Sequence, residues 1–504
     1  MVISAKSASL SGLSVYEINI EVDTINSLPQ ISIIGLGDTA ISEAKERLRL
    51  AIKNSGFSFP STKVVINLAP ADLKKEGSSY DLAMAVGILA KEGNIKNEIS
   101  SKIAFLGELS LDGSLRAVNG IIAIMSELKQ LGIEKLIIPT ENLEEASFID
   151  EVEALGADNL IQVVEYLNGN CELKKLKRNV LDYIEKENDY EIDFSSVKGQ
   201  IQAKKGLELA AAGGHNVLMS GSPGSGKTML SKAFMSILPP LTSRECIELT
   251  KIYSIAGLLD RKHPLITKRP FRSPHHSASS VGIIGGGSNP KPGEITLAHR
   301  GVLFLDEMVE FPRTTLEVLR QPLEDNVVTI SRAQISVQYP ANFILIGAMN
   351  PCPCGFLGDS KKNCTCSEYQ INRYKSRLSG PLLDRIDIQI KVQRLTDEEL
   401  LNASISENSE SIRKRVIKAR EIQAKRYEKE GILTNSELNP KLIKKYCKID
   451  DKTKQFLKNA INQFDLSARA YDRILKISRT IADLENKPDI QLEHIAQALQ
   501  LRSI

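Results

Sequence analysis

The sequence predicts an α/β protein of several domains. Its 504 residues exceed what a single hydrophobic core usually organises. Strand-like and helix-like runs alternate along residues 1–170 and again along 193–395, whereas the remaining C-terminal part is helical and polar. We therefore expect an α+β domain at 1–170, a charged linker at 171–192, an α/β domain at 193–395 and an all-helical domain at 396–504.

The bulk composition is that of an ordinary soluble globular protein, with 42% apolar and 25% charged residues. The net charge of +3 gives no general argument for nucleic-acid binding, so any such site has to be a local patch. The chain contains neither a long apolar run nor the apolar segment of a signal peptide. We expect a cytoplasmic protein without a membrane partner, and reduced thiols rather than disulfides for its seven cysteines.

The segment GSPGSGKT has the pattern of a phosphate-binding loop, and it lies between a strand-like and a helix-like run. Glycine backbones can curl around phosphates, Lys227 can reach the β and γ phosphates, and the Thr228 hydroxyl can ligate Mg²⁺. The sequence therefore predicts ATP and Mg²⁺ as cofactors. The residues expected to bind the nucleotide are Gly221, Ser222, Pro223, Gly224, Ser225, Gly226, Lys227 and Thr228.

Two further strand-like runs end in polar residues. GVLFLDE delivers Asp306, expected to hold Mg²⁺, and Glu307, expected to orient and deprotonate the attacking water. FILIGAMN ends in Asn350, which is placed to touch the γ-phosphate or that water. The alternative for the two carboxylates is an ordinary exposed pair after a strand, and the upstream phosphate loop disfavours it.

The order GSPGSGKT, GVLFLDE, GAMNP, GPLLDRID and SARAYDRIL resembles an AAA+ ATPase of the helicase/chelatase branch over residues 193–504. The resemblance implies a Walker A loop, a Walker B pair, a sensor 1, an arginine finger and a sensor 2. In that order these are Lys227 with Thr228, Asp306 with Glu307, Asn350, Arg385 and Arg469. Because an arginine finger acts on a neighbouring subunit, the resemblance also implies a ring, usually a homo-hexamer. Taken singly, each arginine also fits a surface ion pair.

Two inserted segments are candidates for contact with a substrate in the ring. The first, from Arg269 to Gly301, combines Arg272 with Gly285, Gly286 and Gly287 and suggests a basic, glycine-rich pore loop. Its adjacent histidines make a poor metal site, because neighbouring side chains of a strand point to opposite faces. The second segment surrounds Arg332 and resembles a hairpin of minichromosome maintenance helicases, where a basic residue touches DNA. An edge hairpin with a solvated charge is the alternative.

Residues 1–170 are similar to the C-terminal proteolytic domain of Lon. The similarity places Ser79 at the position of the nucleophile and Ile122 at the position of its partner lysine. A serine needs a base within hydrogen-bond reach to become nucleophilic, and isoleucine cannot serve. We therefore do not expect protease activity.

A loop directly after Asn350 contains two Cys-x-Cys pairs, Cys352 with Cys354 and Cys364 with Cys366. Four thiols within so short a segment can surround a structural Zn²⁺. The Cys-x-Cys spacing is tighter than in most zinc sites, so free thiols and redox chemistry remain alternatives.

The Lon-like domain fused ahead of a chelatase-type module, together with FRSPHHSAS, PGEI and NPCPCG, resembles the ComM/YifB family over nearly the whole chain. This resemblance implies an ATP-driven hexameric DNA motor for branch migration or unwinding during natural transformation. Its DNA partner would be single-stranded or branched. The alternative is a chelatase-type remodeller that acts on a protein partner without DNA.

Overall fold

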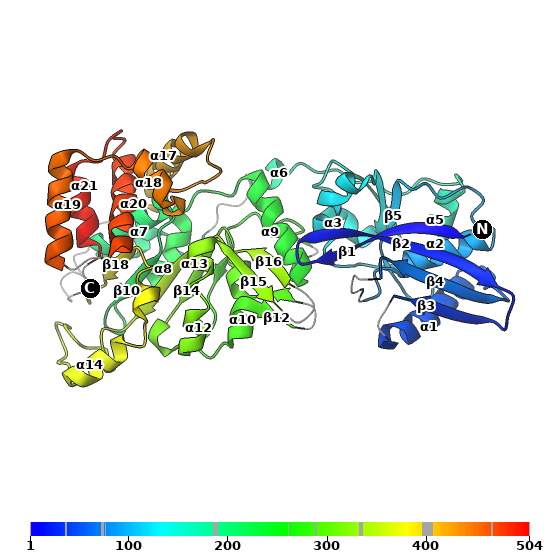
Figure 1. Cartoon of the computed structure of the whole chain (residues 1–504), viewed down its shortest axis with the longest axis horizontal. Coiled ribbons are helices and arrows are strands. Elements are labelled where there is room, and N and C mark those ends of the chain that lie inside the picture. Colours follow the sequence, from blue (N-terminus) through cyan, green and yellow to red (C-terminus); the bar gives the residue numbers. More distant parts are fainter. Residues whose placement is uncertain are drawn as a thin grey trace. The chain divides into compact units, whose positions relative to one another are not determined.

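The computed structural model forms two compact units. Unit 1 consists of Met1–Lys186 and Thr242–Thr267, and unit 2 of Glu187–Leu241 and Lys268–Ile504 (Figure 1). The structure describes residues 2–35, 38–71, 75, 77–184, 190–260, 262–287, 290–331, 336–395, 407–464 and 467–502. The segment 242–267, which the sequence analysis placed in the α/β domain, packs within unit 1. None of the described helices is long and apolar enough to cross a membrane.

Unit 1 is built on a seven-stranded sheet in the order β3-β4-β2-β1-β5-β8-β9. Its strands are β1 (Ile3–Ser11), β2 (Ser14–Ile25), β3 (Gln30–Ile34), β4 (Lys63–Ala69), β5 (Ile103–Phe105), β8 (Lys135–Pro139) and β9 (Glu153–Ala157). Strand β2 is antiparallel to both β1 and β4, and the other neighbouring pairs are parallel. A short hairpin adds β6 (Glu108–Leu109) and β7 (Leu115–Arg116).

The sheet of unit 1 buries an apolar cluster on each face. Leu136 and Ile138 join one cluster and the intervening Ile137 the other, because successive side chains of a strand alternate. Helix α2 is buried from its first residue to Leu89, which its continuous run of small and apolar side chains permits. The helices of this unit are α1 (Asp38–Asn54), α2 (Asp81–Lys91), α3 (Ile121–Leu128), α4 (Leu143–Ala146), α5 (Leu160–Leu167), α6 (Leu181–Ile184) and α9 (Ser243–Ala256), and α9 packs on α3.

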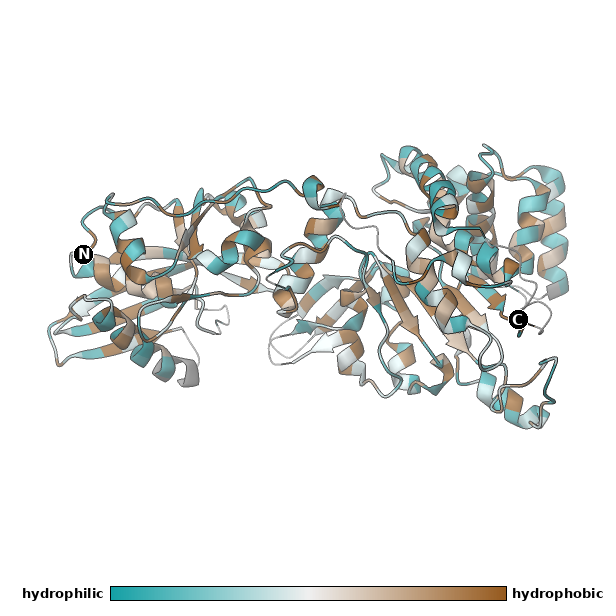
Figure 2. Cartoon of the chain, turned by 180° about the vertical axis from the view of Figure 1, so that it is seen from behind, coloured by the Kyte–Doolittle hydropathy of each residue, from teal (hydrophilic) through white to brown (hydrophobic). Residues whose placement is uncertain are grey.

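Unit 2 is built on a five-stranded, entirely parallel sheet in the order β11-β14-β17-β10-β18. The strands are β10 (Val217–Ser220), β11 (Phe271–Arg272), β14 (Val302–Leu305), β17 (Ile344–Met349) and β18 (Ile388–Lys391). Every residue of β10, β14 and β17 is buried, as expected for parallel strands covered on both faces. Figure 2 shows these strands mostly in the hydrophobic colour. The parallel sheet and the helices around it confirm the predicted α/β pattern of this part of the chain.

Short helices and two hairpins connect the strands of unit 2. The hairpins are β12 (Gly285–Gly286) with β13 (Lys291–Pro292) and β15 (Val327–Ser331) with β16 (Ser336–Pro340). The helices before and between the strands are α7 (Ile201–Gly213), α8 (Lys227–Ala233), α10 (Ser280–Ile284), α11 (Glu294–Leu297), α12 (Arg313–Glu317), α13 (Pro322–Asp325), α14 (Glu368–Lys375) and α15 (Gly380–Leu383).

The C-terminal part of unit 2 is helical, as predicted. It contains α17 (Ser409–Tyr427), α18 (Pro440–Tyr446), α19 (Asp451–Phe464), α20 (Ala468–Leu484) and α21 (Leu492–Gln500). These helices share one hydrophobic core with the sheet, because Val416 and Ile477 belong to the same buried cluster as Ile388 of β18. The likeness of unit 1 to Lon stays a prediction.

Candidate active site

The phosphate loop connects the end of β10 with the first residue of α8, as the sequence predicts. Lys227 is only 9% exposed, and its Nζ donates to the carbonyl oxygens of Gly221 (2.6 Å) and Ser222 (3.1 Å). The same Nζ lies 3.4 Å from Oδ1 of Asn350. Burial lowers the pKa of Lys227, and the charges of the two carboxylates after β14 oppose this shift. The Nζ atom of Lys227 is therefore surrounded by oxygen acceptors, and the oxygens of a bound phosphate can take their place.

The carboxyl ends of three neighbouring strands bring the predicted residues together. The register pairs Ser220 of β10 with Met349 of β17, and Leu305 of β14 with Gly347. Asp306 and Asn350 therefore follow their strands at the same edge of the sheet as the phosphate loop. The Thr228 hydroxyl donates to Oδ2 of Asp306 at 2.9 Å, so these two side chains are already placed to share a Mg²⁺ ion.

Glu307 adopts a backbone conformation that is uncommon for a side chain of its size. Its φ of 48° and ψ of 44° lie in the left-handed region. Its N–H donates to Oδ1 of Asp306 at 3.0 Å, while its own side chain remains exposed. Strained residues of this kind cluster at functional sites, and this turn presents the carboxylate to solvent beside the phosphate loop.

A histidine that the sequence analysis did not assign to the active site approaches Glu307. Nδ1 of His276 lies 3.9 Å from Oε2 of Glu307, and the ring packs edge-on against Phe311. The placement follows from β11, because this edge strand runs parallel to β14 and delivers the next residues to the same end of the sheet. Two residues of strand are too short to recognise from periodicity, so the sequence carried little signal for it.

The predicted pore residues have partners inside unit 2. Arg272 forms a bidentate ion pair with Glu294, with distances of 2.6 Å and 2.7 Å. Gly285 and Gly286 form β12, and a Cβ on Gly285 would lie 2.3 Å from the carbonyl oxygen of Lys291. Gly285, Gly286 and Gly287 all have positive φ, so this turn requires glycine. Arg332 lies outside the described residues, although the hairpin that flanks it is formed.

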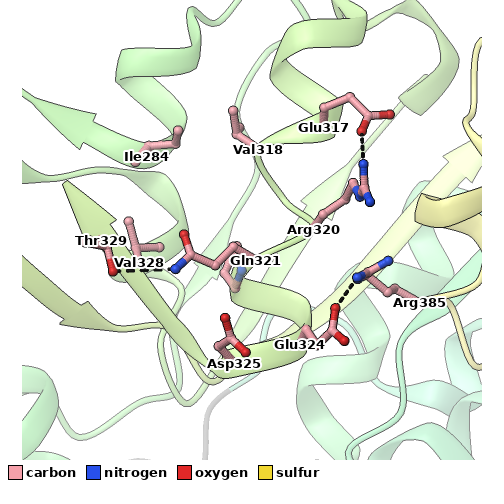
Figure 3. Close-up of a pocket in the computed structure, with 11 residues that line it drawn as sticks. Ile284, Glu317, Val318, Arg320, Gln321, Glu324, Asp325, Val328, Thr329 and Arg385 are labelled. Carbon is pink, nitrogen blue, oxygen red and sulfur yellow. Dashed lines mark hydrogen bonds and ion pairs between the residues drawn. The ribbon is translucent and has the colours of Figure 1, made fainter. Parts of the chain in front are cut away.

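The predicted arginine finger is held within its own subunit. The Arg385 side chain is 7% exposed, ion-pairs with Glu324, and donates from Nη1 to the carbonyl oxygen of Pro381 at 2.7 Å. Figure 3 shows it pointing toward Glu324, and both residues line a cavity of about 510 Å³. The predicted sensor 2 residue, Arg469, is exposed in the first turn of α20. Among the described residues, no hydrogen bond joins either arginine to the phosphate loop.

The four clustered cysteines converge on one point. Their sulfur atoms all lie within 4.8 Å of one another. The Sγ atom of Cys352 is 3.4 Å from that of Cys354 and 3.6 Å from that of Cys364, and the latter two are also 3.6 Å apart. Zn–S bonds of about 2.3 Å place sulfurs about 3.8 Å apart in a tetrahedron, so the cluster has the size of a thiolate metal site.

The thiols of this cluster differ in acidity. Backbone N–H groups of Phe356 and Thr365 lower the pKa of Cys354 to about 6. The N–H of Cys366 acts in the same direction on Cys364, but burial and the neighbouring sulfurs together raise its pKa to about 12. One thiolate is therefore favoured and further ones are not, unless a cation compensates their charge.

In unit 1, the resemblance to Lon singles out two positions, those of the nucleophile and of its partner lysine. Ser79 precedes α2, and its carbonyl oxygen accepts from the N–H of Gly107 at 2.9 Å. Ile122 is fully buried in the first turn of α3, and its N–H donates to Oε1 of Glu145 at 3.0 Å. Glu145 also accepts from the Ser254 hydroxyl of α9, and burial raises the pKa of this carboxyl. Two N–H groups at the start of α3, those of Gly120 and Ile122, are thus bound by Ser254 and Glu145 of the protein itself.

Three family descriptions match the chain. They are "Magnesium chelatase, subunit ChlI" at residues 193–400, "Subunit ChlI of Mg-chelatase" at 20–142 and "Magnesium chelatase, subunit ChlI C-terminal" at 406–502. Together they include the phosphate loop, the predicted Walker B residues and the C-terminal helices.

Similar proteins extend the match to almost the full length. The chain is 42% identical over 494 residues to the competence protein ComM of Haemophilus influenzae, covering 97% of this chain and 94% of that protein. It is 42% identical over 496 residues to the protein YifB of Salmonella typhimurium, covering 98% and 95%. The magnesium-chelatase 67 kDa subunit of Heliobacterium mobile is 28% identical, over 33% of this chain and 29% of that protein. The chain belongs to the ComM/YifB family of magnesium-chelatase-like AAA+ proteins, a class with ATPase activity.

Proposed function

We propose that the protein is an ATP-driven hexameric motor that moves DNA branch points or unwinds duplex DNA. The observation that carries the ATPase step is the convergence of Lys227, the Thr228–Asp306 pair and Glu307 at one edge of the unit 2 sheet. The name of the Haemophilus influenzae relative, a competence protein, supports DNA as the substrate that is moved.

The site's own residues suggest how hydrolysis proceeds. Lys227 would exchange its carbonyl partners for phosphate oxygens, and Thr228 and Asp306 would hold a Mg²⁺ ion, which would neutralise phosphate charge. Glu307 orients the attacking water and takes its proton, and Asn350, already close to Lys227, fixes the γ-phosphate side of the site. These roles explain why polar side chains gather at the carboxyl ends of β10, β14 and β17.

Ring assembly supplies what one subunit lacks. Arg385 has to act on the nucleotide of a neighbouring subunit, and for this it must exchange its bond to Glu324 for a phosphate. The Arg385→Ala variant is expected to retain nucleotide binding and to lose about 10³-fold or more in hydrolysis rate. Unchanged hydrolysis by this variant in the assembled ring would contradict the finger role.

The decisive experiment measures the ATPase rate with and without single-stranded and branched DNA, with Glu307→Gln as the inactive control. The proposal expects strong stimulation by DNA that disappears in the control. Replacing Arg332 by alanine should then reduce strand movement relative to ATP hydrolysis, and unchanged strand movement would argue against the hairpin's role.

The second candidate is a remodeller of a protein partner, and the chelatase-type family matches favour it. Its signature in the same experiment is an ATPase rate indifferent to DNA. A rate that DNA does not change would therefore replace the motor by this second function.

Zinc is part of the proposal as a structural metal. The four thiols would hold it tetrahedrally, and it would have no role in the chemical step. Protein purified without chelator should contain about one equivalent of zinc per chain, and protein without zinc under these conditions would remove it from the proposal.

A further inference from the structure

The cysteine loop lies directly against the phosphate loop. A Cβ on Gly355 would lie 2.7 Å from Cδ and 2.8 Å from Cγ of Pro223, and 3.8 Å from Cγ of Asn350. The Ser222 hydroxyl is close enough to the Asp359 carboxylate to lower the pKa of that carboxyl. Gly355 thus packs against Pro223 of the predicted ATP-binding loop, and Asp359 lies near the preceding residue, Ser222.

The loop has little else to hold it in place. Between Pro351 and Cys366 only Cys352 and Gly355 are buried, and this stretch forms no helix or strand. A segment with so little buried apolar surface cannot offset its own conformational entropy. A metal bound by both Cys-x-Cys pairs would join the two ends of the loop and would supply the missing free energy.

We propose that the metal bound by the four cysteines braces the phosphate loop, so that nucleotide affinity depends on this metal site. The inference rests on the proposed ATPase function and adds a positioning role to the thiol cluster. Without the metal, Gly355 and Asp359 lose their fixed places beside Pro223 and Ser222. The phosphate loop then has to be ordered by the nucleotide itself, which weakens nucleotide binding.

The first test compares the full chain with and without its metal. Metal is removed with a chelator, the chelator is dialysed away, and Mg²⁺ is restored before ADP binding is titrated. We expect the metal-free protein to bind ADP about tenfold more weakly and added Zn²⁺ to restore the affinity. Co²⁺ in place of Zn²⁺ reports thiolate coordination by its absorption spectrum. Equal ADP affinity with and without the metal would overturn the brace.

The second test uses a matched pair of variants that does not depend on metal removal. Gly355 and Gly358 both have positive φ, 84° and 76°, so alanine strains the backbone similarly at both. Only at Gly355 does the added Cβ meet the phosphate loop, since nothing lies within 4 Å of a Cβ on Gly358. Gly355→Ala should weaken ADP binding while keeping its metal, and Gly358→Ala should change neither.

The outcomes separate this inference from the function on which it rests. Equal ADP affinity in the two variants, with the metal present in both, would contradict the brace and leave the ATPase intact. Failure of the metal-loaded wild-type protein to bind any adenine nucleotide would overturn the proposed function itself.

Discussion

Helix α8 of unit 2 and helix α3 of unit 1 bind the polar groups of their first turns differently. In unit 2 the first residue of α8 is Lys227, whose Nζ is held by backbone carbonyls that a phosphate can replace. In unit 1 the first turn of α3 contains Ile122, whose side chain is fully buried and whose N–H is bound by Glu145. Unit 2 keeps its polar groups exchangeable for a ligand, whereas unit 1 satisfies this helix start internally.

A buried carboxylate in each unit shows a second contrast, in the direction of its pKa shift. Asp387 of unit 2 ion-pairs with Arg473, lies 3.4 Å from His215, and accepts from the N–H of Asn216 at 3.1 Å. Burial raises the pKa of Asp387, but Arg473 and His215 lower it by more than burial raises it, so the carboxylate stays charged. Asp81 of unit 1 has Arg47 at 2.8 Å, and there burial outweighs the ion pair and raises the pKa to about 6.

The largest expected effect tests whether chemistry is confined to unit 2. Glu307→Gln keeps the shape of the side chain and removes the base, so the ATPase rate should fall by about 10²- to 10⁴-fold. Nucleotide binding should persist, because Lys227 and Thr228 are unchanged. The matched variant in unit 1 is Ser79→Ala, which should leave hydrolysis at the wild-type rate. A comparable loss in Ser79→Ala would break the contrast between the units.

The second prediction concerns stability in unit 2. Asp387→Asn leaves Arg473 without its partner at a buried site, which costs about 3–5 kcal/mol of unfolding free energy at neutral pH. Since the folded-state pKa of Asp387 is lowered, its contribution is complete above the unfolded value of about 4 and is lost as the pH falls below it. Urea unfolding at several pH values measures this.

A surface control separates burial from charge. Asp451 begins α19 with a side chain that is 98% exposed, and its ion pair with Lys454 lies on the surface. Asp451→Asn should change stability little. A similar loss of unfolding free energy in both variants would show that the buried ion pairs of Asp387 stabilise the protein no more than a surface ion pair does.

The elements that the sequence predicted well are those whose local pattern decides them. The apolar runs of β10, β14 and β17 end in residues with a distinctive chemistry, so both the strands and the placement of Lys227 and Asp306 could be inferred. Parallel strands that are buried on both faces leave few alternatives for such runs. The four cysteines differ: their clustering within 15 residues suggested a zinc site, their tight spacing left free thiols and redox chemistry as alternatives, and only the structure shows the four sulfurs together.

The features that the sequence did not predict depend on contacts between residues that are far apart in the sequence. Glu324 binds Arg385 across 61 residues, and Ser254 of α9 binds Glu145 across 109 residues. Hydrophobic periodicity reports which face of an element is buried, but it does not report which other element covers that face. Segment 242–267 therefore looked like part of the α/β domain, although its contacts lie within unit 1.

The last prediction concerns the pH dependence of unit 1, which should have the opposite sign to that of Asp387 and, at about 3 kcal/mol at most, should not exceed the effect of Asp387→Asn. Because the folded-state pKa of Asp81 is raised to about 6, the folded protein retains this proton between about pH 4 and pH 6 and loses stability as the pH rises. A difference of about two pKa units corresponds to about 3 kcal/mol. Asp81→Asn has no proton to lose, so its stability relative to wild type should improve over this interval. Urea unfolding at pH 4.5 and pH 7 measures the change, and a constant difference between variant and wild type would mean that Arg47 holds Asp81 charged throughout.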